Sequence, residues 1–211
     1  MRETWLMKNL DCYTKRGRKF IAAQHDTTKI LKRIFPSLIF VHSVNATQAE
    51  DCYIYCDKIL SGVAEIKCRE YINRRTQLPY KLDTIRKQYD NEYLITKTKI
   101  DNLRMISEQR KIPSFIFLNL PSEKKIVRFK ITNANGDFVT PIQSRTTRTM
   151  YSCNNYKGTT ERENAFLPLD NKNVMLISYW KSMTCIFLTF LQKGGWRMVL
   201  DMVRFSRCYD Y

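Results

Sequence analysis

The first regular pattern of apolar positions along the chain predicts a helix over residues 13–35. Apolar side chains recur there at helical spacing, and lysines and arginines fill much of the remaining surface. Pro36 follows directly, and because proline cannot continue a helix, the helix should end there. The next apolar run, residues 37–43, has the length of a strand.

Later patterns add a second helix and further strands. Residues 96–110 carry a narrow apolar stripe at helical spacing, and Thr96 is placed to cap the first turn. The run SFIFLNL, residues 114–120, predicts a strand between two prolines, and residues 124–132 alternate as a half-exposed strand does. The segment NANGDF then predicts a turn into another strand. The order is therefore helix, three strands, helix, strand and further strands, which indicates an α/β domain.

Residues 51–70 alternate in a way that predicts a hairpin with its turn near Asp57 and Lys58. Antiparallel pairing about that turn sets Cys52 opposite Ala64. Because side chains alternate between the faces of a strand, one face should then be small or apolar throughout and form the core face. Its members are Cys52, Ile54, Cys56, Leu60, Gly62, Ala64, Ile66 and Cys68.

The same register gathers three charged side chains on the opposite face of the hairpin. Asp51, Glu65 and Lys67 come within cross-strand reach of one another there. Two converging carboxylates repel unless a cation lies between them, and Mg²⁺ with oxygen ligands fits this position, with the carbonyl of Ile66 as a further ligand. Such an ion supplies a water of lowered pKa for attack on phosphorus, and Lys67 would orient that water. An ordinary cross-strand ion pair is the structural alternative.

Charge and cysteine usage narrow the choice of partner and compartment. The 211 residues contain 36 lysines and arginines against 20 acidic residues, a formal charge of +16 that favours polyanions. Nucleic acid is the first candidate partner and an anionic membrane surface is the second. The seven cysteines include no CxxC pair and have no zinc-ligand spacing to a histidine. Their odd number, without an apolar secretory segment near Met1, favours a reducing compartment.

The pattern D-x13-E-x-K, preceded by a helix and a strand and followed by a helix and a strand, resembles the PD-(D/E)XK nuclease superfamily. The resemblance covers about residues 13–120, and the wording GVAEIKCR and YLITKTKID is similar to small phage-encoded members. It implies a restriction-endonuclease-like αβββαβ core, with a mixed central sheet flanked by helices and extra C-terminal strands. The implied activity is a DNA endonuclease that depends on Mg²⁺ or Mn²⁺. Such a protein would act in the cytoplasm, that of the host if a phage encodes it, as a homodimer in some cases and without a membrane partner.

By position, the resemblance assigns Asp51 and Glu65 as metal carboxylates and Lys67 as the motif lysine. Lys99, or alternatively Lys97, would match the lysine or glutamine that such enzymes often add from the second helix. Many members also carry an acidic residue on the first helix. The inward position here is Gln24, with Asp26 nearby, so the expected glutamate is missing and a second metal site is in doubt.

Basic residues after the motif are candidates for contacts with phosphate groups. They are Arg69, Arg74, Arg75 and Lys81, together with Lys97 farther along, and a solvated basic loop is the alternative. The polar segment 145–162 would be either a loop lying on DNA or a long surface connection. Two readings compete with a simple endonuclease: a structure-specific nuclease of the Holliday-junction-resolvase kind, and a non-catalytic DNA-binding protein on the same fold.

The end of the chain changes character, so the nuclease domain is assigned to residues 1–177 and a C-terminal extension to residues 178–211. An almost continuous apolar stretch begins at Val174 and reaches Leu191. Lys181 and several hydroxyl side chains interrupt it, which disfavours a membrane span. A packed terminal helix, a strand pair and a poorly ordered extension are the alternatives.

Overall fold

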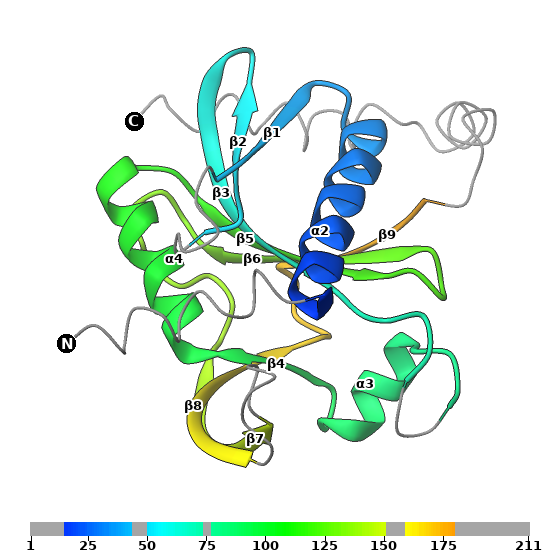
Figure 1. Cartoon of the computed structure of the whole chain (residues 1–211). Coiled ribbons are helices and arrows are strands. Elements are labelled where there is room, and N and C mark those ends of the chain that lie inside the picture. Colours follow the sequence, from blue (N-terminus) through cyan, green and yellow to red (C-terminus); the bar gives the residue numbers. More distant parts are fainter. Residues whose placement is uncertain (1–14, 44–49, 74–76, 151–158, 180–211) are drawn as a thin grey trace.

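The computed structural model describes residues 15–43, 50–73, 77–150 and 159–179, which form three helices and nine strands (Figure 1). In chain order the elements are α2 (Lys15–Ile34), β1 (Leu38–His42), β2 (Cys52–Cys56), β3 (Ile59–Cys68), α3 (Leu82–Gln88), β4 (Glu92–Thr96), α4 (Lys97–Arg110), β5 (Ser114–Leu120), β6 (Lys125–Thr132), β7 (Gln143–Met150), β8 (Thr159–Pro168) and β9 (Val174–Ser178). The protein is therefore of the α/β class.

Two sheets organise these elements. A mixed six-stranded sheet has the order β1-β2-β3-β5-β6-β9, in which β3 and β5 run parallel and the other neighbours run antiparallel. A smaller antiparallel sheet has the order β4-β8-β7. The parallel pair is joined by a long crossover that contains α3, β4 and α4, as parallel strands require.

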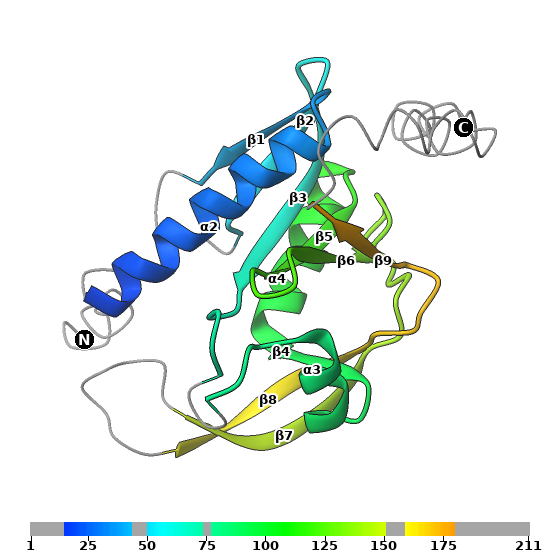
Figure 2. The ribbon, with the colours of Figure 1, turned by 90° about the vertical axis from the view of Figure 1, so that its right-hand side faces the viewer.

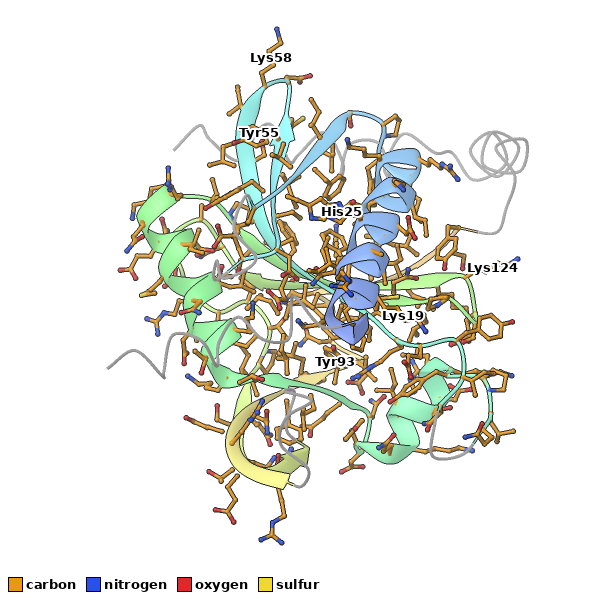
Figure 3. The ribbon with its side chains drawn as sticks, viewed as in Figure 1. Lys19, His25, Tyr55, Lys58, Tyr93 and Lys124 are labelled. Carbon is orange, nitrogen blue, oxygen red and sulfur yellow. The ribbon has the colours of Figure 1, made fainter. Side chains whose placement is uncertain are left out.

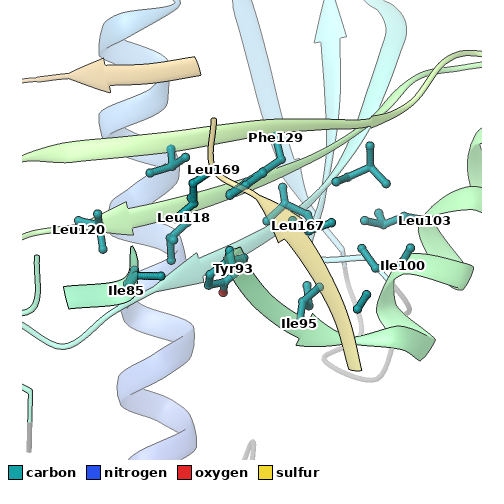
Figure 4. Packing of buried hydrophobic residues seen from close by; sticks show 14 of the residues in the cluster. Ile85, Tyr93, Ile95, Ile100, Leu103, Leu118, Leu120, Phe129, Leu167 and Leu169 are labelled. Carbon is teal, nitrogen blue, oxygen red and sulfur yellow. The ribbon is translucent and has the colours of Figure 1, made fainter. Parts of the chain in front are cut away.

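The six-stranded sheet is covered on both faces, which gives the molecule three layers (Figures 1 and 2). Helix α2 packs on one face, where Leu31 meets Phe40, Ile66 and Phe117. Helix α4 and the smaller sheet pack on the other face. There a cluster of side chains joins the two sheets through Ile100, Leu103, Tyr93, Ile95, Leu167, Leu118 and Phe129 (Figure 4). Each face of the large sheet therefore contributes to an apolar core.

The predicted hairpin register is confirmed, with Cys52 opposite Ala64 and left-handed backbone at Asp57 and Lys58 in the turn. Lys58 projects outward from the tip of that turn (Figure 3). The face assignment of Leu60 is wrong. The pairing slips between Ile54 and Tyr55, so that Ser61 is an extra residue in β3 and Leu60 turns toward the α4 side. Such a bulge leaves no apolar signature in the sequence.

Other predicted elements are confirmed with small shifts of their ends. The strand at residues 114–120 has the predicted bounds, and helix α4 begins one residue after Thr96, which is its N-cap although its side chain caps no backbone group. Helix α3 and strand β4 were not predicted. The interpretation of residues 145–162 as a loop or surface connection is wrong for its two ends, which belong to strands β7 and β8, and residues 151–158 between them lie outside the described residues. Polar side chains on both faces of these strands hide the alternation that marks a strand.

The described chain closes the large sheet with β9, which pairs with β6. Beyond it, the backbone N–H of Tyr179 donates to Lys124 O, and its hydroxyl donates to the Asn119 side chain at 3.1 Å. The predicted extension otherwise lies outside the described residues. No helix among the described residues is both long enough and apolar enough to cross a membrane.

Candidate active site

Asp51 lies where the β2–β3 pairing stops and extends that pairing with its side chain. Its backbone N–H donates to Ala64 O at 3.1 Å, the last backbone contact of this ladder. Strand β3 continues toward Cys68 beside β5 but without β2, so the N–H of Ile66 has no backbone partner on the β2 side. The Asp51 carboxylate accepts from that N–H at 2.7 Å and so satisfies it. The backbone of β3 therefore fixes the orientation of the carboxylate.

Gln24 on α2 completes this edge of the site from the opposite layer. Its side-chain amide nitrogen donates to the Asp51 carboxylate at 3.0 Å and to the carbonyl of Ile66 at 3.2 Å. The position is the inward one that the sequence indicates on the first helix. Asp26 is exposed and pairs with Lys29 at 3.0 Å, so it takes no part here. Gln24 therefore ties α2 to the Asp51 carboxylate and to the Ile66 carbonyl.

Glu65 points to the α4 face of β3 and is completely buried. One of its oxygens accepts from Lys67, and the other accepts from Lys99 of α4 at 3.1 Å. The two lysine side chains retain about a third of their exposure, at 35% and 31%. A buried carboxylate is thus held between two cations that still reach water. We refer to Asp51, Glu65, Lys67 and Lys99 as the charged cluster.

The pKa values of Asp51 and Lys67 are both raised, which favours the neutral form of the acid and the charged form of the amine. Burial, followed by the negative charge of Glu65, raises the pKa of Asp51 to about 6, although both lysines and the Ile66 N–H oppose this. Burial disfavours the ammonium form of Lys67. The charges of Glu65 and Asp51 outweigh that effect, so the pKa of Lys67 lies above its ordinary value. Near neutral pH the cluster therefore combines a carboxyl of unusually high pKa with a firmly protonated amine.

The oxygens at this position suit a hard divalent cation. Asp51 and Glu65 supply carboxylates, and the Ile66 carbonyl lies on the same side of β3 as Asp51, since both contact Gln24. Among the described residues no group of three or more His, Cys, Asp or Glu side chains could hold a metal ion. Two carboxylates with a carbonyl and several waters are nevertheless what Mg²⁺ commonly uses. The donor set therefore fits Mg²⁺ and does not fit zinc.

The predicted phosphate-binding residues are not all placed together. Arg69 is half-buried, with its guanidinium 5.4 Å from the ring centre of Tyr80 and 5.3 Å from that of Tyr93. Lys97 pairs with Asp101 one helical turn away rather than with Glu65. Lys81 is exposed at the start of α3. Arg74 and Arg75 lie outside the described residues.

Two histidines that the sequence did not indicate as site residues lie between α2 and β1, where His42 contacts the backbone of Asp51. The rings of His25 on α2 (Figure 3) and His42 on β1 are 3.9 Å apart between their centres. Thr28 contacts the His42 ring at 2.9 Å, and burial, followed by the neighbouring His25 ring, lowers the pKa of His42. They lie 17 residues apart in the sequence, so only the docking of α2 on β1 brings them together.

Comparisons of the chain with protein-family models, with curated proteins and with solved structures find no match.

Proposed function

We propose that the protein is a metal-dependent nuclease that hydrolyses phosphodiester bonds in DNA, with the PD-(D/E)XK arrangement on a restriction-endonuclease-like core. The observation that carries the proposal is the charged cluster itself. Asp51 before β2, Glu65 and Lys67 on β3, and Lys99 at the start of α4 come from separate parts of the chain and meet at one place.

The order of the elements supports the same proposal. Helix α2 and strands β1, β2 and β3 are followed by α4 and β5, which gives the order αβββαβ once α3 and β4 are treated as an insertion. Strand β5 lies beside β3 in the large sheet, and α4 contributes Lys99 to the motif that β3 carries. This arrangement is what the resemblance of the sequence implies.

The energetic cost of the charged cluster also favours a function. Moving an ionised carboxylate from water into a protein interior costs several kcal/mol, and pairing rarely returns more than that. An apolar residue at position 65 would pack on the α4 face as Val63 does at no such cost. Retaining Glu65 between two part-exposed ammonium groups is consistent with a site that binds a charged ligand.

In the proposed reaction a water oxygen bonds to phosphorus, the bond from phosphorus to the leaving sugar oxygen breaks, and a water proton passes to that oxygen. A divalent cation held by Asp51, Glu65 and the Ile66 carbonyl would lower the pKa of a water molecule and offset phosphate charge. The charges of Glu65 and Asp51 keep Lys67 protonated, Lys99 retains about a third of its exposure, and each lysine would stabilise charge that develops on phosphate. Gln24 would keep Asp51 oriented.

The decisive experiment incubates the purified protein with linear, circular, single-stranded and branched DNA, with and without Mg²⁺. We expect cleavage that requires Mg²⁺, stops with chelator and disappears in Glu65→Gln and Lys67→Ala. Cleavage that persists in both variants, or that ignores chelator, would contradict the proposal. Product sizes distinguish endonuclease from exonuclease.

A non-catalytic DNA-binding protein is the second candidate, because both oxygens of Glu65 already accept from lysines as in a structural ion-pair network. Under this reading the protein retards DNA in a gel but leaves every substrate intact at all Mg²⁺ concentrations. The Lys67→Ala variant would then be less stable, with no activity to lose.

A junction-cutting enzyme would instead need two symmetric sites, so the mass in solution should be that of a dimer.

A further inference from the structure

A short hairpin leaves the catalytic end of β3 and has no part in the proposed chemistry. An antiparallel bridge between Ile72 and Pro79 joins residues 71–73 to residues 77–80. The N–H of Tyr80 donates to Tyr71 O at 2.9 Å, and that of Asn73 donates to Leu78 O at 2.8 Å. In Figures 1 and 2 residues 71–73 continue from the lower end of β3, away from the β2–β3 turn at the top. We refer to the described residues 71–73 and 77–80 as the β3 hairpin.

The β3 hairpin exposes large apolar side chains to water. Tyr71 is 60% exposed, Leu78 is 64% exposed and Ile72 is 37% exposed. Isolated exposed apolar residues are ordinary on protein surfaces, but the pairing of Ile72 with Pro79 places Tyr71 and Leu78 on one face of the hairpin and Ile72 on the other. The hairpin therefore presents an apolar surface that its own fold does not bury.

The root of the β3 hairpin is held firmly against the rest of the molecule. The Arg69 guanidinium packs between the rings of Tyr80 and Tyr93, and Tyr93 is buried in the core that joins the two sheets (Figures 3 and 4). Beyond the hairpin, the N–H of Leu82 donates to the side chain of Glu123, and the Ser122 hydroxyl donates to Tyr80 O. Side chains on so well anchored an element lose little freedom when they bind a partner.

The surroundings of the β3 hairpin favour an anionic partner. Exposed Lys81, Arg86 and Lys87 follow it on and before α3, against exposed Asp83, which pairs with Arg86 at 3.4 Å, and half-buried Glu70. The whole chain carries +16. Aromatic and apolar side chains among cations are the usual means of binding unpaired nucleic-acid bases, whose faces stack on them while the phosphates meet the positive charge.

The distance to the proposed catalytic residues suits a single substrate. Tyr71 follows Lys67 by four positions, so their Cα atoms are at most about 14 Å apart. Stacked nucleotides rise about 3.4 Å each along a strand. A base on Tyr71 would therefore lie within roughly four nucleotides of a phosphate at the charged cluster.

We propose that the β3 hairpin binds unpaired DNA bases next to the phosphate to be cut, so that the substrate is DNA with a single-stranded stretch at the site. This inference rests on the proposed nuclease function, because only that function makes the charged cluster the place where the phosphate is cut. The binding itself depends on the hairpin alone, because stacking on Tyr71 and apolar contact with Leu78 require no metal. Fully paired duplex offers no free base face and would contact only the basic residues.

The test measures DNA binding by fluorescence anisotropy in EDTA, where no hydrolysis occurs. The probes are a labelled single strand, a duplex with a single-stranded tail, and a fully paired duplex. We expect Tyr71→Ala to weaken binding of the first two about tenfold and to change duplex binding less than twofold. Tyr71→Phe should keep the affinity, because the ring face remains. The dependence on salt should not change, since no charge is removed.

Ile59→Ala is the matched control, because Ile59 is 67% exposed at the opposite end of β3. It should bind all three probes as the unaltered protein does. Equal affinity of the Tyr71→Ala variant for single strand, or an equal loss on duplex, would overturn the proposal. These outcomes are independent of the nuclease assignment, which is judged by Mg²⁺-dependent cleavage in the same preparations. If the protein cuts duplex DNA and Tyr71→Ala changes no binding affinity, the nuclease proposal stands and the hairpin proposal is wrong.

Discussion

Helix α4 touches two buried polar clusters of opposite character, one near each end. Near its start, Lys99 belongs to the charged cluster with Glu65. Near its end, the Ser107 hydroxyl accepts from Thr132 on β6 at 2.8 Å, and Thr132 and Ser114 on β5 share a hydrogen bond of 2.7 Å. We refer to these three residues as the hydroxyl chain. All three are completely buried.

The two clusters differ in the way expected of buried polar groups that stabilise a fold and of polar groups that bind a ligand. The hydroxyl chain is neutral, excluded from water and made of groups that satisfy one another, so it adds specificity to the core at small cost. The charged cluster buries a carboxylate while its two lysines still reach water. Such an arrangement is expensive for a purely structural role and open to a ligand. Substitutions in the hydroxyl chain should alter stability, and substitutions in the charged cluster should alter activity.

The largest expected effect is the loss of cleavage when the charged cluster is changed. Glu65→Gln removes a proposed metal carboxylate, and Lys67→Ala removes a cation that would face phosphate. We expect each to lower the rate of Mg²⁺-dependent cleavage by at least about 100-fold, as removal of one preorganised charge commonly does. Single-turnover rates on labelled DNA measure this. Undiminished rates in both variants would show that the cluster is structural.

The next effect concerns the hydroxyl chain and should appear in stability alone. Thr132→Val keeps the shape of the side chain but leaves the Ser107 and Ser114 hydroxyls without their shared partner. We expect unfolding free energy to fall by about 2 kcal/mol, measured by denaturant titration. The triple change with Ser107→Ala and Ser114→Ala should recover most of that loss. Cleavage per folded molecule should stay normal, and a specific loss of cleavage would erase the contrast between the clusters.

A smaller effect is a pH dependence of stability that belongs to Asp51. Its pKa is raised in the folded protein from 3.8 to about 6, so between about pH 4 and pH 6 the folded state binds more protons than the unfolded state. The contribution of Asp51 to the unfolding free energy therefore falls as pH rises through that window. We expect about 1–2 kcal/mol, allowing for partial solvent screening, in metal-free denaturant titrations. The Asp51→Asn variant lacks the titrating group and should lose this slope. An identical slope in both proteins would contradict the assignment.

The smallest predicted effect belongs to Gln24, which touches the charged cluster from the other layer. Gln24→Leu removes two hydrogen bonds, one to Asp51 and one to the Ile66 carbonyl. We expect a roughly fivefold fall in cleavage rate with DNA affinity unchanged, about the worth of one hydrogen bond. Asp26→Ala on the exposed side of α2 is the control and should cut normally. Equal losses in the two variants would show that α2 matters only as a support.

Much of this arrangement could be read from the sequence because local patterns specify it. The turn at Asp57 and Lys58 fixed the register that sets Cys52 opposite Ala64, and the prolines at 113 and 121 bracket β5. The meeting of Asp51 with Glu65 followed from that register. The contact of Lys99 with Glu65 came from the family resemblance, since no local pattern links residues 34 positions apart.

The remainder depends on long-range packing that no local window contains. The face of β3 that carries Glu65 was expected to be the open one, but α4, β4 and β8 cover it. Strand β4 has only five residues and runs straight into α4, so its apolar positions merge with the helical pattern. The extra residue Ser61 moves Leu60 to the other face without a change in composition.

Strand β4 ends at Thr96 and α4 begins at Lys97, so no linker separates the smaller sheet from the helix that carries Lys99. Each residue of an α-helix advances about 100° around the axis. A single residue inserted at this junction would swing the Lys99 amine far from Glu65 while leaving the sheet intact. The direct junction of β4 and α4 therefore sets the direction in which the Lys99 amine points. Variants that change the length of this junction would show how strongly the orientation of that amine depends on the smaller sheet.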